Sequence, residues 1–231
     1  CEDQKITTQG DWSSVTQEKS PLPLISLLLE ALWSPKLPGL KITTKARSPK
    51  GAGIGGSSSL GISVAAALWQ ARHKLTGSPL YTEEELVQTV RDVEAKLIHS
   101  PTGLQDYWAA VRGGLNLISY PFGRPHVETL PVSFQKPLQE RLIVAYSGVS
   151  RQSAINNWEV FKHIFEKTGE VFTTMNELGQ EAINCTRALK EKNWQEALTF
   201  SQKEWQKRCQ LWPAVETPET KELAQIAYRQ G

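Results

Sequence analysis

The sequence has no apolar run long enough to cross a bilayer. The longest run, Ser63–Trp69, falls far short of the ~20 residues that a spanning helix needs. Cysteine is also scarce, because Cys1, Cys185 and Cys209 are widely spaced and odd in number, with neither a disulfide framework nor a metal-binding pattern. The formal net charge is only +2, which gives no argument for binding to nucleic acid or to an anionic membrane. These absences predict a globular protein of the cytoplasm, where thiols stay reduced.

The stretch Pro49–Leu60, PKGAGIGGSSSL, is the most informative part of the chain. Four glycines are followed by three serines and then by an apolar, alanine-rich segment that favours a helix. Glycines let a phosphate approach the backbone, and a helix N-terminus attracts anions. Serine hydroxyls at that end can bond phosphate oxygens or ligate the Mg²⁺ that a nucleotide carries. We interpret the stretch as a phosphate-binding loop; the alternative is a flexible linker before a serine-capped helix.

Two missing features separate this loop from the commoner phosphate-binding types. No lysine precedes Ser57, so the loop is not a Walker A motif. A long helix is expected to continue to about His73. It leaves no room for the second strand, with an acidic residue at its end, that follows the glycine loop in a dinucleotide-binding fold. The loop therefore needs another explanation.

Hydrophobic spacing predicts helices over residues 22–33, 58–74, 83–97 and 107–112. Thr82 with Glu85 forms a capping-box pattern ahead of the third of these. Strands are predicted over residues 40–46, 115–120 and 126–132, and a buried strand over 142–146. Residues 1–19 are expected to be irregular or edge structure. From Asn157 onward the pattern is that of amphipathic helices with core-facing stripes, in which Cys185 and Cys209 would be inert thiols.

A phosphate-binding loop needs polar partners, and several residues are candidates. Asp106 follows a Pro-Thr-Gly turn and could act as an acid or base, or could simply be a helix N-cap. Glu94 could supply a carboxylate for Mg²⁺, although the pattern taken alone favours a solvated residue on its helix. Arg151 could steady an anionic substrate group or be an exposed arginine. Lys50 could lie near phosphates or be solvated, and His99 beside Ser100 is weak evidence for nucleophilic catalysis.

These motifs resemble those of the GHMP kinase superfamily. Pro49–Ser59 is similar to its signature Pro-x-x-Gly-Leu-Gly-Ser-Ser-Ala, with Ile54 for leucine and Gly56 for the first serine. Pro101–Asp106, with the glycine pair at 113–114, resembles the region that carries the family's catalytic aspartate. That region and Tyr146–Arg151 look most like the sugar-1-kinase branch, in which D-glycero-D-manno-heptose 7-phosphate kinases are the nearest group.

The resemblance implies an α+β fold with a mixed sheet and a largely helical C-terminal part. Residues 1–156 would be an ATP-binding N-terminal domain and residues 157–231 the helical part of a C-terminal domain. The implied activity is ATP-dependent phosphorylation of a hydroxyl on a sugar or sugar phosphate. Asp106 would be the base, Ser57 (or Ser58 in a shifted register) and Glu94 would bind Mg²⁺, and Arg151 would contact the substrate. The phosphates of ATP would lie on Gly51, Ala52, Gly53, Ile54, Gly55, Gly56, Ser57 and Ser58.

The sequence also departs from the superfamily pattern at both ends. No Gly-Arg-x-Asp-x-x-Gly-like stretch lies before Leu22, and no Gly-Ala-Gly-Gly-Gly motif follows Tyr228. We therefore expect either a longer kinase, of which this chain is a piece truncated at both ends, or a degenerate member. The degenerate member would be a non-catalytic nucleotide- or sugar-binding protein on a kinase-like fold.

Overall fold

The computed structural model describes residues 6–16, 20–49, 51–148, 157–166, 170–212 and 215–230. Helices dominate these residues, and the strands among them form one two-stranded antiparallel sheet. The described residues divide into two compact units, one up to Leu142 and one from Ile143 onward. The predicted domain boundary after residue 156 stays a prediction, and the wider mixed sheet is not present in the part of the chain that the structure describes.

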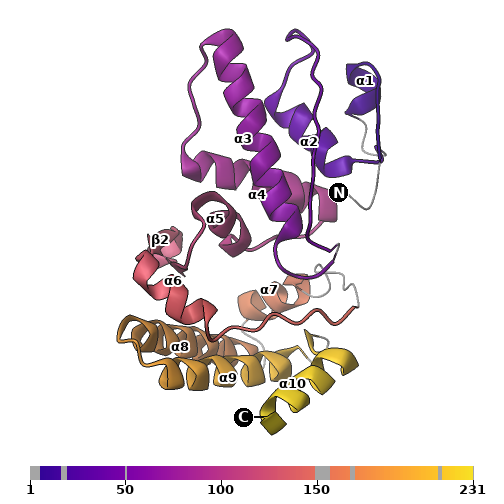
Figure 1. Ribbon diagram of the computed structural model, residues 1–231. Coiled ribbons are helices and arrows are strands. Elements are labelled where there is room, and N and C mark those ends of the chain that lie inside the picture. The colour runs from indigo at the N-terminus through magenta and orange to yellow at the C-terminus, as the bar shows by residue number, and fades with distance from the viewer. Residues whose placement is uncertain are drawn as a thin grey trace. The chain divides into compact units, whose positions relative to one another are not determined.

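The first unit is built on helices, with one hairpin (Figure 1). Its helices are α1 (Trp12–Val15), α2 (Pro23–Leu32), α3 (Gly56–Thr76), α4 (Glu83–Ile98), α5 (Gln105–Arg112) and α6 (Val132–Gln139), with the short 3₁₀ helix η1 (Pro121–Gly123). The hairpin pairs β1 (Asn116–Ser119) with β2 (His126–Thr129), in a register that sets Ile118 opposite Val127. The predicted helices and these two strands are confirmed, whereas α1 lies in a segment that was expected to be irregular.

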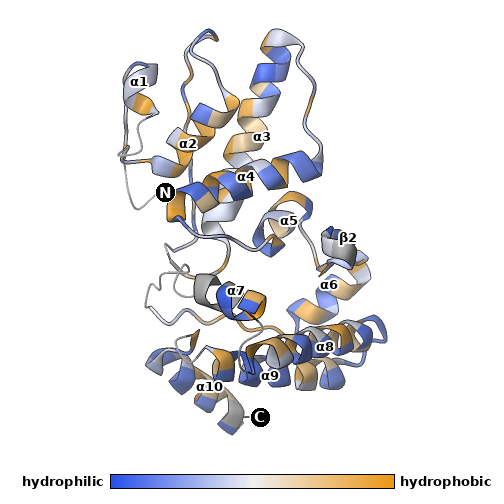
Figure 2. Cartoon of the chain, turned by 180° about the vertical axis from the view of Figure 1, so that it is seen from behind, coloured by the Kyte–Doolittle hydropathy of each residue, from blue (hydrophilic) through white to orange (hydrophobic). Residues whose placement is uncertain are grey.

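Helix α3 is the centre of the first unit, where it packs against α2, α4 and α5 (Figure 1). Leu28 and Ala65 are fully buried between these helices. At Gly61 a Cβ would lie 2.6 Å from Val90 Cγ1, so only glycine allows α3 and α4 to come this close. Helix α2 is rich in leucine and mostly buried, and much of its ribbon has the hydrophobic colour in Figure 2. Helix α3, which follows the glycine loop, is thereby held in a packed core.

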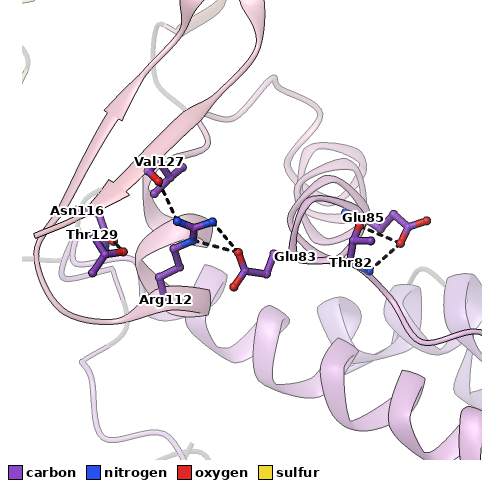
Figure 3. A network of polar contacts seen from close by, with 7 residues as sticks. All are labelled: Thr82, Glu83, Glu85, Arg112, Asn116, Val127 and Thr129. Carbon is purple, nitrogen blue, oxygen red and sulfur yellow. Dashed lines mark hydrogen bonds and ion pairs between the residues drawn. The ribbon is translucent and has the colours of Figure 1, made fainter.

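Side-chain contacts fix α4 and tie it to the hairpin (Figure 3). Thr82 accepts a bond from the Glu85 backbone while the Glu85 carboxylate accepts from the Thr82 N–H, which confirms the predicted capping box. Arg112, at the end of α5, donates two bonds to Glu83 at 3.0 and 2.8 Å and one to the Val127 carbonyl at 2.8 Å. One arginine thus joins α4, α5 and β2.

Two of the strand predictions are wrong. Residues 40–46 have no regular structure and no strand partner among the described residues, and they line a cavity of about 610 Å³ against one face of α3. The apolar run Leu142–Tyr146 is not a buried strand either, because Ile143 and Val144 are 93% and 84% exposed. Both segments have the composition of strands, but a strand forms only where another one pairs with it.

The second unit is helical, as predicted. It contains α7 (Asn157–Glu166), α8 (Val171–Lys190), α9 (Trp194–Leu211) and α10 (Pro218–Gln230), of which α8 and α9 pack against each other. Polar and apolar colours alternate along α8 and α9 in Figure 2, as in amphipathic helices. The stripes are only partly buried, however, since Leu178 is buried but Phe172 on α8 and Leu198 on α9 are 44% and 52% exposed.

Two further observations concern the described cysteines and helices. Cys185 and Cys209 are free, and burial raises the pKa of each thiol, which keeps them protonated and unreactive. Over the ranges that the structure describes, none of the helices combines the length and the apolar character that crossing a membrane requires.

Candidate active site

The predicted phosphate-binding loop leads directly into the N-terminus of α3. Gly51, Gly53 and Gly55 all have φ close to +70°, and α3 begins at Gly56 with Gly55 as its N-cap. The first turn of this helix carries no acidic residue. The unpaired N–H groups of a helix N-terminus attract anions, and here no carboxylate of that turn opposes them. The serine cap of the linker alternative does not fit, because Gly55 is the N-cap of α3 and no side chain makes a cap bond there.

Both candidate loop serines point at the same carboxylate. Ser57 Oγ donates to Glu94 Oε1 at 2.5 Å, and Ser58 Oγ donates to Glu94 Oε2 at 3.1 Å. Glu94 is only 8% exposed, so the alternative of a solvated helix residue is wrong. A buried carboxylate requires hydrogen-bond donors, and the loop supplies two of them. The structure thus brings together three residues that the sequence placed in one site.

Tyr107 is the member of this cluster that the sequence did not reveal. Its side chain is 2% exposed, and its hydroxyl lies 2.6 Å from Glu94 Oε2 and 3.0 Å from Thr102 Oγ1. Burial and the hydrogen bond to Glu94 raise the pKa of the phenol, so Tyr107 stays protonated and donates. Its place directly after Asp106 in a helical segment was the available signal, but an aromatic residue there is equally typical of a core.

Asp106 lies in the first turn of α5, not at its N-cap, which is Leu104. The alternative of a capping aspartate is therefore wrong. A Cβ built at Gly55 would lie 3.1 Å from both Cβ and Cγ of Asp106, so this carboxylate stands against the glycine loop. Partial burial, and then the negative charge of Glu94, raise the pKa of Asp106. Two carboxylates and the loop thus share one neighbourhood.

The oxygen atoms of this cluster suit a hard cation. Ser57 and Glu94 offer a hydroxyl and a carboxylate oxygen, the ligand types that Mg²⁺ prefers. Within the described ranges no group of three or more histidine, cysteine or acidic residues could hold a metal by itself. Mg²⁺ in phosphoryl-transfer sites is usually held by one or two protein oxygens together with substrate phosphates, and the residues present fit that arrangement.

Two of the remaining candidate residues, Arg151 and Lys50, fall outside the described residues, and the cavity beside α3 is separate from this cluster. The cavity beside α3 shares Gly56 with the loop and is also lined by Ser59, but neither Asp106 nor Glu94 lines it. The carboxylate cluster and this cavity therefore lie on different sides of the start of α3.

Comparison with known proteins agrees with this geometry. Residues 22–114 match the family described as the GHMP kinases N terminal domain, a range that includes the loop, Glu94 and Asp106. The D-glycero-alpha-D-manno-heptose 7-phosphate kinase of Campylobacter jejuni is 22% identical over 189 residues, which are 79% of this chain and 53% of that protein. The chain thus spans about half the length of the curated relative that it matches. The predicted resemblance is confirmed at the level of the superfamily.

Proposed function

Since residues 22–114 match the family described as the GHMP kinases N terminal domain, we propose that this chain is part of an ATP-dependent kinase that phosphorylates a hydroxyl of a sugar or sugar phosphate. The observation that carries the proposal is the convergence of the loop serines on buried Glu94, with Asp106 against the same loop. The distant heptose 7-phosphate kinase supports a sugar phosphate as the acceptor class.

In the proposed site the phosphates of ATP lie on the backbone of Gly51–Ser58 and at the N-terminus of α3. Ser57 and Glu94 hold Mg²⁺, which when bound neutralises phosphate charge. The cavity beside α3 has room for the nucleoside, because its volume of about 610 Å³ is within the range of small-molecule sites and Gly56 and Ser59 border it.

Asp106 is the proposed base. The acceptor hydroxyl oxygen attacks the γ-phosphorus, the bond from that phosphorus to the ADP oxygen breaks, and the hydroxyl proton passes to the Asp106 carboxylate. Because the pKa of Asp106 is raised, this carboxylate accepts a proton more readily than an exposed aspartate does. Arg151 is proposed to contact the anionic group of the acceptor, and the protein is proposed to act in the cytoplasm.

The test is acceptor-dependent ADP release by the natural full-length protein, measured on a panel of sugars and sugar phosphates. Asp106→Asn should lower kcat by about 10²–10⁴-fold, the usual contribution of a general base. Binding of MgATP, measured by calorimetry, should be nearly unchanged. Asp92→Asn is the matched control, because Asp92 lies on α4 near the site's Glu94 in sequence but is exposed and pairs with Arg91.

A parent-like rate in Asp106→Asn would refute the assignment of the base. Binding of nucleotide by the parent without turnover of any acceptor would instead favour the non-catalytic binding protein. The two results separate the alternatives that the sequence left open.

A further inference from the structure

The Tyr107 hydroxyl has one proton, and its contacts include two oxygens, Glu94 Oε2 and Thr102 Oγ1. A carboxylate without its proton only accepts hydrogen bonds, so the 2.6 Å contact requires Tyr107 to donate to Glu94 Oε2. With that proton committed, the 3.0 Å contact to Thr102 is satisfied when the Thr102 hydroxyl donates to the phenol oxygen. The chain of contacts thus has one direction, from Thr102 through Tyr107 to Glu94.

The hydrogen bonds to Glu94 decide which of its two carboxylate oxygens remains for a ligand. Oε2 already accepts from Tyr107 and from Ser58, whereas Oε1 accepts from Ser57. Ser57 Oγ and Glu94 Oε1 are 2.5 Å apart. A hydroxyl and a carboxylate oxygen in direct contact are of the ligand types that Mg²⁺ prefers, so these two atoms would be the ones to hold the ion.

We propose that Tyr107 is a positioning residue, whose hydroxyl fixes the rotation of the Glu94 carboxylate so that Oε1 and Ser57 Oγ face the same metal ion. The inference rests on the proposed function, because the ion is the Mg²⁺ of MgATP. It assigns a task to a side chain that does not itself touch metal or substrate.

The first turn of α5 then serves the site in two ways. Neighbouring residues of a helix point about 100° apart, so Asp106 reaches the glycine loop while Tyr107 enters the core. The position of the base and the orientation of the metal ligand thus depend on the same turn. Ligand orientation by buried partners commonly contributes 10–100-fold in metal affinity.

Tyr107→Phe removes the hydroxyl and keeps the ring. We expect Mn²⁺ in the presence of ADP, measured by electron paramagnetic resonance, to bind about tenfold more weakly than in the parent protein. In the kinase assay the Mg²⁺ concentration for half-maximal rate should rise, with a smaller change in kcat at saturating Mg²⁺. Tyr81→Phe is the matched control, because the Tyr81 ring packs against Trp69 at a tilted angle in the same unit.

Thr102→Val is a second variant that leaves the Tyr107 bond to Glu94 in place and removes the donor behind it. Its Mn²⁺ affinity should lie between those of the parent and Tyr107→Phe, and it keeps the test decisive if the latter does not fold. Parent-like Mn²⁺ affinity in both variants would overturn the inference and leave the kinase proposal intact. A parent protein that binds no Mn²⁺ with ADP would overturn both.

Discussion

Replacing Gly55 by alanine tests whether the glycine loop sets the position of Asp106. Gly55 and Gly77 are the residues that flank α3, and both are left-handed, with φ of +70° and +67°. They differ in their surroundings, because a Cβ at Gly77 meets nothing within 4 Å whereas one at Gly55 meets Asp106 at 3.1 Å. The pair therefore separates backbone strain from displacement of the carboxylate.

The strain should be similar in the two variants. An L-residue in the left-handed region costs about 1–2 kcal/mol, and the more restricted unfolded chain offsets about 0.4–1 kcal/mol of it. Gly55→Ala and Gly77→Ala should thus each lower the free energy of unfolding by roughly 1 kcal/mol. Urea unfolding followed by tryptophan fluorescence measures this change as a shift in midpoint at constant slope.

The activities should differ. Carbon atoms pack best at about 3.5–4.0 Å, so a Cβ at Gly55 must push Asp106 away by roughly 0.4 Å or more. A misplacement of about 1 Å can cost 10²-fold in rate, so we expect kcat of Gly55→Ala to fall by about tenfold and that of Gly77→Ala to stay near the parent value. Equal kcat values in the two variants would refute the idea that the loop positions Asp106.

Two further changes bear on stability. Asp106→Asn should stabilise the protein at neutral pH. Because the pKa of Asp106 is raised in the folded state, its contribution to stability is present below the ordinary aspartate pKa and is lost as the pH rises through the folded-state value. Urea unfolding at about pH 3 and about pH 7 should show the gain in stability at the higher pH alone, and a less stable variant at neutral pH would contradict this sign. Arg112→Ala should lower the free energy of unfolding by about 1–2 kcal/mol, because it removes bonds to Glu83 and the Val127 carbonyl. Arg91→Ala is the control, since Arg91 pairs with the next residue, and it should change the free energy of unfolding by less than about 0.5 kcal/mol. Equal losses would contradict the role of Arg112 in joining α4, α5 and β2.

Local chemistry made part of this molecule predictable. The capping box at Thr82 and Glu85 is a contact over three residues, and the start of α3 depends on the glycines immediately before it. The placement of Asp106 behind a turn is local as well. Such features involve neighbours in the chain, so the sequence contains all that determines them.

Features that depend on distant partners were not predictable. Residues 40–46 and the apolar run Leu142–Tyr146 have the composition of strands, yet pairing partners are a property of the fold and none is present among the described residues. The burial of Glu94 was recoverable in part, because Val87, Val90 and Glu94 follow one another at three and four residues on the buried stripe of α4. The pattern places a carboxylate in the core but cannot say that Ser57 and Tyr107 satisfy it.

The burial of Glu94 couples the integrity of the site to the integrity of the whole first unit. Its donors come from α3 and α5 while it stands on α4, next to side chains that hold these helices together. Local opening of α3 or of α5 would therefore take hydrogen-bond donors away from this carboxylate, which makes partial opening costly. Heat or denaturant should then remove the site and unfold the helices as one cooperative event, with no inactive but still folded form between them.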